Sequence, residues 1–230
     1  MKLLITSGGT SEKIDQVRSI TNHSTGKLGA LIAESFLAQG DQVTLVTTQN
    51  AVKPPAHPNL TIQIIENVQD LLETMQPLVK THGVLIHSMA VSDYTPIYMT
   101  GFEQITASQD LTEFLNKTND QGNISAKDEY QVLFLKQTPK IISQVKKWNP
   151  NIRLIGFKLL VDVSKEELLT VARASLAKNQ AEIIVANDLY DISNNQHHAY
   201  LVKENSVIEA NTKEEISQQL VTHIHTKDNL

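Results

Sequence analysis

Residues 1–10 read MKLLITSGGT, residues 26–40 read GKLGALIAESFLAQG, and residues 42–47 read QVTLVT. The first piece holds a short apolar run followed by glycines, which is typical of a buried strand that ends in a turn. Apolar residues of the second piece recur every three or four positions, as on the buried side of a helix. The third piece is rich in β-branched residues and predicts another buried strand. Together they predict a strand–helix–strand unit, the building block of parallel sheets.

The helix predicted at 26–39 carries signals at both of its ends. Ser24 or Thr25 is expected to cap its start, because a hydroxyl there can accept from the free amides of the first turn. Gly40 is expected to end it, because glycine readily adopts the left-handed conformation found after helices. Its buried side would be formed by Leu28, Leu31, Ile32, Ser35 and Phe36.

The same alternation of short β-branched runs and amphipathic stretches continues along the chain. Further strands are predicted at residues 60–65, 83–87, 130–135, 153–157 and 183–186. Further helices are predicted at 68–80, at 139–147 with Pro139 in the first turn, at 165–178 and at 213–225. The C-terminal part differs, because 199–203 and 207–210 predict an antiparallel β-hairpin. The expected fold is α/β, with a mostly parallel sheet flanked by helices and a C-terminal hairpin.

Residues 95–127 interrupt this alternation with a polar segment that contains several turn signals. Long insertions of this kind in compact domains are usually lids, binding loops or linkers. We therefore expect residues 1–230 to form a single domain, with a flap or loop insertion at 95–127.

The composition favours a folded globular protein over a disordered or fibrous one. The 230 residues are 40% hydrophobic and 20% charged, and the formal net charge of −5 gives no support to a nucleic-acid or anionic-membrane partner. The chain has no cysteine, which excludes disulfides, thiolate metal sites and thiol nucleophiles. It also has no recognisable signal peptide and no apolar run long enough to span a membrane, so a cytoplasmic protein is expected.

Gly8-Gly9-Thr10 directly follow the first predicted strand. Glycines at this place let a ligand approach the backbone at the carboxyl end of a parallel strand, where open α/β sheets bind nucleotides and phosphates. The segment is not a dinucleotide-binding fingerprint, because no third glycine follows at the required spacing, and Thr25-Gly26-Lys27 does not form a Walker A loop. A plain tight turn remains an equal alternative for these glycines taken alone.

The segment before the first predicted helix is unusually rich in polar side chains. It places Arg18, Asn22, His23, Ser24 and Lys27 close to a helix start, where free amides and the helix dipole favour a phosphate or carboxylate. Simple capping by the hydroxyls is the alternative. The cations, the amide and the imidazole exceed what capping requires, and they predict an anion site.

A third polar group follows the strand at 83–87, in the sequence His87-Ser88-Met89-Ala90-Val91-Ser92-Asp93-Tyr94. A carboxylate at the carboxyl end of a strand suits a ribose hydroxyl or a metal ion carried by a triphosphate. A turn-forming Asp93 is the simpler local explanation. The pairs His197-His198 and His223 with His225 lack nearby acidic or thiol companions, so they are expected to face solvent, and no protein metal site is assigned.

In sequence order, these segments resemble the signature blocks of one family, phosphopantothenate–cysteine ligase. The first block is Gly8-Gly9-Thr10 with Asp15-x-Val17-Arg18-x-Ile20-x-Asn22-His23-Ser24-x-Gly26-Lys27-x-Gly29, and the second is Ala90-Val91-Ser92-Asp93-Tyr94. The later blocks are Thr138-Pro139-Lys140-Ile141-Ile142, Ile155-Gly156-Phe157 and Ala186-Asn187-Asp188. The resemblance spans nearly the whole chain, and five blocks in order are far more specific than any one of them.

The resemblance implies a Rossmann-like fold and a homodimer whose phosphopantothenate site lies near the partner subunit. It implies a ligase of coenzyme A biosynthesis that joins 4′-phosphopantothenate to L-cysteine through an acyl-cytidylate, with CTP (or ATP) as co-substrate and Mg²⁺. Family members are often fused behind a flavin-dependent decarboxylase. This chain begins at the first strand of the ligase, so a free-standing ligase without flavin is expected.

The resemblance also assigns roles to positions of this sequence. Asn22 is implied as the catalytic residue, polarising the acyl group in the second half-reaction. The implied substrate-binding residues are Gly8, Gly9, Thr10, Arg18, His23, Ser24, Gly26 and Lys27. The implied nucleotide-binding residues are His87, Ser88, Met89, Asp93, Pro139, Lys140, Ile141, Ile142, Phe157 and Lys178.

Two positions depart from the pattern of the family. The family's flap lysine falls on Asn123, with Lys117 and Lys127 nearby, and a second family lysine falls on Ala174, beside Arg173. A nucleotide- or flavin-binding module without ligase activity is therefore one alternative. A nicotinamide-dependent dehydrogenase is another, which the α/β pattern permits and the missing fingerprint disfavours.

Overall fold

An eight-stranded sheet organises the computed structural model, which describes residues 1–119, 128–193 and 196–227. The order is β12-β11-β10-β9-β6-β1-β4-β5. All neighbours are parallel except at one edge, where β11 pairs antiparallel with both β10 and β12. The strands are β1 (Lys2–Ser7), β4 (Gln42–Thr48), β5 (Leu60–Ile65), β6 (Val84–His87), β9 (Arg153–Leu160), β10 (Ile183–Asp188), β11 (Ala199–Val202) and β12 (Val207–Ala210). The predicted α/β fold and its C-terminal hairpin are confirmed.

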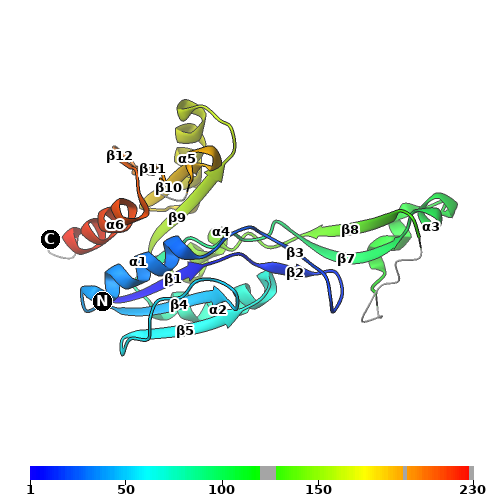
Figure 1. Ribbon diagram of the computed structural model, residues 1–230, viewed down its shortest axis with the longest axis horizontal. Coiled ribbons are helices and arrows are strands. Elements are labelled where there is room, and N and C mark those ends of the chain that lie inside the picture. The colour runs from blue at the N-terminus through cyan, green and yellow to red at the C-terminus, as the bar shows by residue number, and fades with distance from the viewer. Residues whose placement is uncertain (120–127, 194–195, 228–230) are drawn as a thin grey trace.

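Helices cover both faces of this sheet (Figure 1). In β1, Leu3 and Ile5 point to one face and Leu4 to the other, because successive side chains of a strand alternate. The first face packs against α1 (Lys27–Ala38) and α6 (Lys213–Lys227). The opposite face packs against α2 (Val68–Thr81), α4 (Ile142–Trp148) and α5 (Lys165–Asn179). Both faces are apolar, which explains why the strands read as continuous hydrophobic runs.

The chain changes direction across the sheet between β1 and β6. From β1 it passes through α1 to β4, and from β5 it returns through α2 to β6 on the other side of β1. The loops that follow β1 and β6 therefore leave neighbouring strands in opposite directions. A crevice at such a switch point is the usual ligand site of an open α/β sheet.

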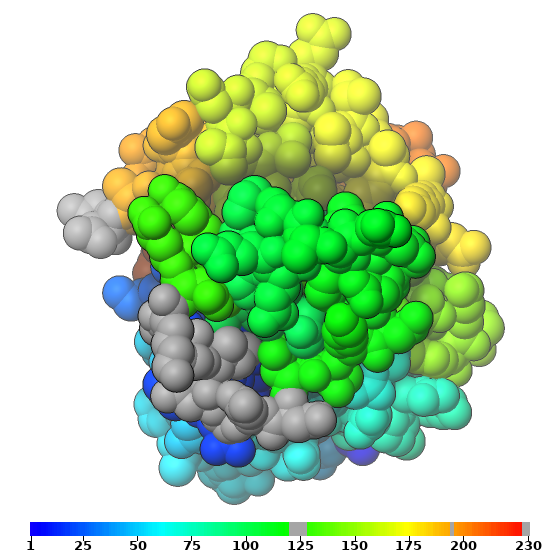
Figure 2. Space-filling view, turned by 90° about the vertical axis from the view of Figure 1, so that its right-hand side faces the viewer, coloured from blue at the N-terminus to red at the C-terminus, as the bar shows by residue number. Residues whose placement is uncertain are grey.

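A long antiparallel ribbon, here called the arm, projects from the body of the molecule (Figure 1) and stands in front of it in Figure 2. It consists of β7 (Tyr94–Gly101) and β8 (Gln131–Gln137), with α3 (Phe102–Ala107) and the 3₁₀ helix η1 (Leu111–Asn116) at its tip. Phe114 is buried there, with its ring 5.4 Å from that of Phe134.

The arm corrects two expectations about this segment. The strand predicted at 130–135 exists, but it pairs with β7 instead of joining the main sheet. The segment at 95–127 is an insertion, yet its first part is strand and helix rather than loop. The strand was not predicted because its pairing partner is distant in sequence, from Gly101 opposite Gln131 to Tyr94 opposite Gln137. Asn123 and Lys127 lie outside the described residues. The division of the chain into one domain stays a prediction.

Three smaller features also differ from expectation. Gly26, with φ 76°, is the N-cap of α1, so neither Ser24 nor Thr25 occupies the N-cap position, although Oγ1 of Thr25 accepts from the amide of Lys27 (3.4 Å). Pro139 lies before α4 and not in its first turn, because the carbonyls that accept the first hydrogen bonds of this helix are those of Lys140 and Ile141. The short hairpin of β2 (Ser11–Lys13) and β3 (Ser19–Thr21) was not predicted.

Gly40, with φ 83°, follows α1 as predicted. A further 3₁₀ turn, η2 (Leu189–Asp191), follows β10. Among the described residues, no helix is both long enough and apolar enough to cross a membrane.

Candidate active site at the switch point of the sheet

A cleft of about 1030 Å³ lies at the carboxyl ends of the parallel strands. Its walls come from the segments that follow β1, β6, β9 and β10, from the start of α1 and from the segment before α4. The cleft therefore lies at the topological switch point, where the architecture predicts a ligand site.

Hydrogen bonds join the loops after β1 and β6 into one wall. The backbone amide of Ala90 donates to the carbonyl of Gly8 (2.9 Å), and the backbone amide of Thr10 donates to the carbonyl of Ala90 (3.0 Å). The hydroxyl of Thr10 donates to Ser92 Oγ (2.9 Å) and accepts from the Ser92 amide (2.8 Å). Gly9 cannot carry a side chain here, because a Cβ would overlap the carbonyl of Asn22. The polar groups of Thr10 and Ser92 thus satisfy each other and hold the loops together.

The start of α1 is anchored to the end of β1. Ser7 Oγ donates to the carbonyl of Gly26 (3.1 Å), and the positive φ of Gly26 is a conformation that residues with side chains rarely adopt. This turn brings the Asn22 backbone against Thr10, to which its amide donates (3.3 Å). The side-chain amide of Asn22 forms no hydrogen bond with a described residue and faces the cleft. It is available to a ligand.

His87 closes the floor of the cleft. Its Nδ1 lies 2.7 Å from Oγ1 of Thr6, and the ring is 7% exposed. Burial lowers the pKa of His87 to about 4, so the imidazole is neutral near pH 7. Ser88 beside it donates to the carbonyl of Thr6 (2.7 Å). A neutral His87 in this place acts as a hydrogen-bonding wall and does not supply charge.

The cleft is cationic although the protein is acidic. Its lining includes Lys27, Lys140, Lys158 and Lys213, against the single carboxylate of Asp93. Lys140 forms an ion pair with Asp93, whereas the other three lysines pair with no acidic residue in the described part of the chain. With a net charge of −5 for the whole protein, this local excess of cations favours an anionic ligand.

The structure brings most of the predicted site residues together. Those that line the cleft are Gly8, Asn22, His23, Ser24, Gly26, Lys27, His87, Ser88, Met89, Asp93, Pro139, Lys140, Ile141, Ile142 and Phe157. Their individual roles stay predictions, since no ligand identifies them.

Four predicted residues do not line the cleft. Gly9 and Thr10 lie behind it and shape the loop. Arg18 lies on the hairpin of β2 and β3, where its guanidinium donates to Asp15 (2.6 Å). Lys178 is exposed on α5. The roles assigned to Arg18 and Lys178 therefore rest on the resemblance alone.

Among the residues that line the cleft without a role predicted from the sequence are Lys158, Asn187, His197 and Lys213. Asn187 belongs to the block Ala186-Asn187-Asp188 at the end of β10, and Lys158 lies within β9, directly after the block Ile155-Gly156-Phe157. Nothing in the sequence connects His197 or Lys213 with the N-terminal segments. The fold brings them there through β11, β12 and α6.

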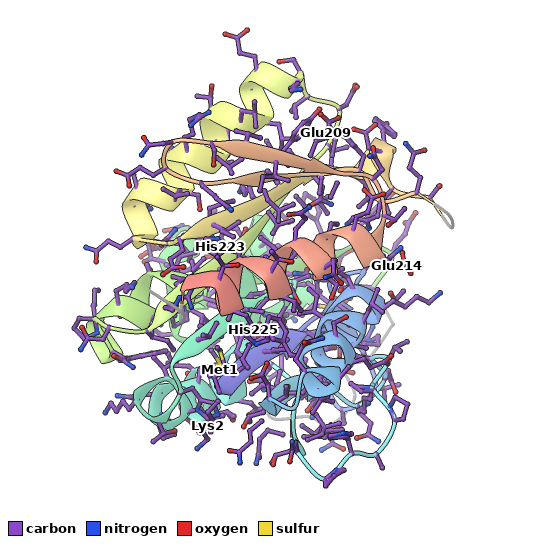
Figure 3. All side chains as sticks on the ribbon, turned by 90° about the vertical axis from the view of Figure 1, so that its left-hand side faces the viewer. Met1, Lys2, Glu209, Glu214, His223 and His225 are labelled. Atoms are coloured by element: carbon purple, nitrogen blue, oxygen red, sulfur yellow. The ribbon has the colours of Figure 1, made fainter. Side chains whose placement is uncertain are left out.

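The expectation that the paired histidines face solvent is wrong. His197 is 8% exposed, and His198 donates to Glu209 (2.6 Å). Figure 3 shows His223 and His225 on α6. His223 pairs with Glu182 (3.1 Å), and His225 pairs with Asp41 (2.8 Å). These acidic partners are distant in sequence, which is why inspection of neighbouring residues could not find them.

Among the described residues, no group of three or more histidine or acidic side chains is arranged so that it could hold a metal ion. The available carboxylate in the cleft is that of Asp93, 63% exposed. A divalent cation at this place would therefore depend mainly on oxygens of its ligand.

The sheet, its switch point and the cleft define an α/β protein with a cationic cleft at the carboxyl ends of its strands, which suits an anionic small molecule. Residues 1–227 match the family described as DNA/pantothenate metabolism flavoprotein C-terminal domain, and the chain belongs to this family.

Known relatives agree with this assignment. The coenzyme A biosynthesis bifunctional protein CoaBC of Thermococcus kodakarensis is 30% identical over 224 residues, which cover 95% of this chain and 49% of that protein. The chain thus spans about half the length of the curated relatives it matches.

Two crystal structures are similar over nearly the full chain. The DNA/pantothenate metabolism flavoprotein from Streptococcus pneumoniae is 59% identical with a TM-score of 0.95, and the match covers 99% of both chains. The C-terminal domain of a CoaBC protein is 28% identical with a TM-score of 0.74, covering 99% of this chain and 95% of that one. Both confirm the fold.

Proposed function

We propose that this chain is a ligase that joins 4′-phosphopantothenate to L-cysteine, with CTP as the activating nucleotide. The family and the coenzyme A biosynthesis proteins among its relatives support this reaction. The single observation that carries the proposal is the cationic cleft at the switch point, which places an unpaired amide, Asn22, beside the start of α1. Both substrates of the first step are anionic, so the charge of the cleft suits them.

The first half-reaction activates a carboxylate, which is a poor electrophile. A carboxylate oxygen of phosphopantothenate attacks the α-phosphorus of CTP, the bond to the bridging oxygen breaks, and pyrophosphate leaves with that electron pair. Lys27, Lys158 and Lys213 line the cleft, have no acidic partner among the described residues and offset the negative charge that gathers there. The product is an acyl-cytidylate with a good leaving group.

The second half-reaction forms the amide. The amine of cysteine attacks the acyl carbon, and the tetrahedral oxyanion collapses to expel CMP while the nitrogen loses a proton. We assign the stabilisation of this oxyanion to the side-chain N–H of Asn22, which is half-buried and free of hydrogen bonds to described residues. Gly9 sets its position, because no larger residue fits against the Asn22 carbonyl.

The residues of the cleft fit a magnesium nucleotide better than a protein-held metal. Bound Mg²⁺ would neutralise part of the triphosphate charge and polarise the phosphorus. Asp93 would be the protein's carboxylate closest to such an ion, and Lys140, which pairs with it, would hold it in place. We keep ATP as the alternative nucleotide.

The remaining predicted contacts follow the walls of the cleft. The segment of Ser24, Gly26 and Lys27 would hold phosphopantothenate at the free amides of α1. The walls formed by His87 to Met89 and by Pro139 to Ile142, with Phe157, would hold the nucleotide.

We further propose that the chain acts as a homodimer that associates through the arm. The arm carries exposed apolar side chains on both strands and at its tip, namely Tyr94, Phe102, Leu111, Leu115, Tyr130 and Leu135. A ribbon that projects from the body with such a surface is unfavourable in water and is best explained by a covering partner (Figures 1 and 2). A second copy of the chain provides a matching surface.

Product analysis tests the proposed reaction. Purified protein is incubated with phosphopantothenate, cysteine, Mg²⁺ and CTP, and the products are identified by mass spectrometry. We expect the amide, CMP and pyrophosphate in equal amounts, with ATP in place of CTP as a parallel arm. Binding of nucleotide without any amide product would instead support a non-catalytic binding module.

A further inference from the structure

A second cavity, of about 520 Å³, adjoins the cleft between the starts of α1 and α6. Three side chains line both spaces, namely Lys27, His197 and Lys213. The place where the cavity and the cleft meet is here called the junction. Lys213 has so far been given only a share in offsetting the negative charge in the cleft, and His197 has been given no role.

His197 is the unusual member of this group. Its side chain is 8% exposed, and its Nδ1 forms no hydrogen bond with any described residue. The backbone holds the residue in place, because the amide of His197 donates to the carbonyl of Asn211 (2.8 Å) and the residue bridges to Ile192. Buried polar atoms almost always have partners, so this unpaired nitrogen beside a cavity leaves a hydrogen-bonding position for a ligand or an ordered water to complete.

The charge state of His197 suits a neutral hydrogen-bond donor. Burial, together with the nearby ammonium of Lys213, lowers the pKa of His197 to about 4. The ring is therefore neutral near pH 7 and carries one N–H. The ammonium groups of Lys27 and Lys213 would repel a cationic ligand. An oxyanion, in contrast, would accept hydrogen bonds from Lys27, His197 and Lys213.

The two lysines are placed for the same ligand class. Lys27 is the first residue of α1 and Lys213 the first residue of α6, so both helix starts face the junction. Neither lysine pairs with an acidic residue in the described ranges. The N-cap residue of α1, Gly26, has no side chain, and only the Lys27 amide is taken up, by Oγ1 of Thr25 (3.4 Å), so the amides that follow it in the first turn remain open to an anion.

The acidic residues of the cavity limit where an anion can lie. Glu34 and Glu214 line the small cavity but not the cleft. Their repulsion keeps a phosphate out of the far end of the cavity and at the junction, beside the proposed reaction centre.

We propose that Lys27, His197 and Lys213 form a phosphate-binding subsite at the junction, which takes either the terminal phosphates of the nucleotide or the phosphate of phosphopantothenate. This inference extends the proposed function but depends on a separate property, the binding of a phosphate group. Inorganic pyrophosphate is a suitable probe because its binding requires no turnover.

Calorimetric titration of the full chain with inorganic pyrophosphate tests the subsite. Lys213→Gln removes one charge-assisted contact and should weaken binding about tenfold. Lys203→Gln, in the loop of the C-terminal hairpin and outside both spaces, is the matched control and should bind as the unsubstituted protein does.

His197→Phe separates binding from folding. Replacing an unpaired buried ring nitrogen with carbon should leave the melting temperature unchanged or raise it, while pyrophosphate binding weakens. If both variants bind pyrophosphate as tightly as the unsubstituted protein, the subsite is wrong. A lower melting temperature of His197→Phe with unchanged binding by Lys213→Gln also overturns it, since the ring is then only structural.

Paired ligands identify the source of the phosphate. A loss by Lys213→Gln of CTP affinity but not CMP affinity assigns the subsite to the nucleotide. A loss of phosphopantothenate affinity but not pantothenate affinity assigns it to that substrate. If the unsubstituted protein shows no ligase activity but Lys213→Gln still loses pyrophosphate binding, the subsite is supported and the proposed reaction is rejected. Failure of the subsite and failure of the proposed function are therefore distinguishable.

Discussion

Oγ1 of Thr6, in β1, lies 2.7 Å from Nδ1 of His87, at the end of β6. This contact joins the two central strands at the point where the sheet changes direction, and it buries an imidazole directly beneath the cleft. Its consequence is a pKa of about 4 for His87, because burial penalises the charged ring. Folding is therefore coupled to the protonation of this residue.

The first prediction concerns acid stability. The folded pKa of His87 lies below the ordinary value of 6.5, so the unfolded chain binds the proton more tightly. The contribution of His87 is complete above pH 6.5 and is lost as the pH falls towards 4, by about 3 kcal/mol. Urea unfolding at several pH values measures this slope.

The control for acid stability is a pair of substitutions. His87→Gln should flatten the pH dependence of the unfolding free energy, although His82 and His197 retain part of it, since their pKa values are also lowered by burial. His57→Gln changes an exposed histidine and should leave the slope unchanged. An unchanged slope for His87→Gln would show that the ring is not protonated on unfolding in this window.

The second prediction separates the two half-reactions. Asn22→Asp should still form the acyl-nucleotide but lose amide formation by about 10²–10³-fold, because a carboxylate cannot donate to the oxyanion. Rapid-quench analysis of acyl-CMP and amide measures both steps. Asn151→Asp, on an exposed turn, is the control. Amide formation at the normal rate by Asn22→Asp would reject the role of this residue.

The third prediction concerns the ion pairs that α6 forms with the sheet. Glu182 accepts from Arg153 (3.1 Å) and pairs with His223 (3.1 Å). Glu182→Gln leaves a mostly buried guanidinium without its carboxylate and should lower the unfolding free energy by about 2 kcal/mol. Glu204→Gln, exposed in the hairpin loop, should change it by less than about 0.5 kcal/mol. Equal unfolding free energies of the two variants at pH 7 would contradict a stabilising role of the Glu182 ion pairs.

The fourth prediction concerns association through the arm. Leu111 and Leu115 are more than half exposed at the tip. The double substitution Leu111→Glu with Leu115→Glu should convert a dimer into a monomer, because charge at an apolar interface opposes its burial. Light scattering after size exclusion measures the mass. Ile64→Glu, exposed on edge strand β5, is the control. A double variant that keeps the dimer mass would place the interface elsewhere.

Much of the fold could be predicted from the sequence, because buried parallel strands and amphipathic helices have strong periodic signals. Strand β7 was missed because Pro96 interrupts its pattern and because its partner β8 lies beyond the tip of the arm. The pairing partner of β8 could not be predicted either, because the residues of a strand do not specify which strand lies beside it.

The site was predictable where its residues directly follow strands or precede a helix. Asn22 and His87 lie in such segments, and both line the cleft. Arg18 shows the opposite case, because Asp15 orders the turn and holds the guanidinium outside the cleft. His197 and Lys213 reach the cleft only through tertiary packing, which leaves no pattern in the sequence.

Exchange of labelled pyrophosphate into CTP tests the central claim most directly. The exchange requires reversible formation of an acyl-nucleotide, and it needs neither cysteine nor the second half-reaction. We predict that label enters CTP in the presence of Mg²⁺ and phosphopantothenate, and that none enters when phosphopantothenate is left out. A folded sample that shows no phosphopantothenate-dependent exchange, with CTP or with ATP, would contradict the ligase assignment.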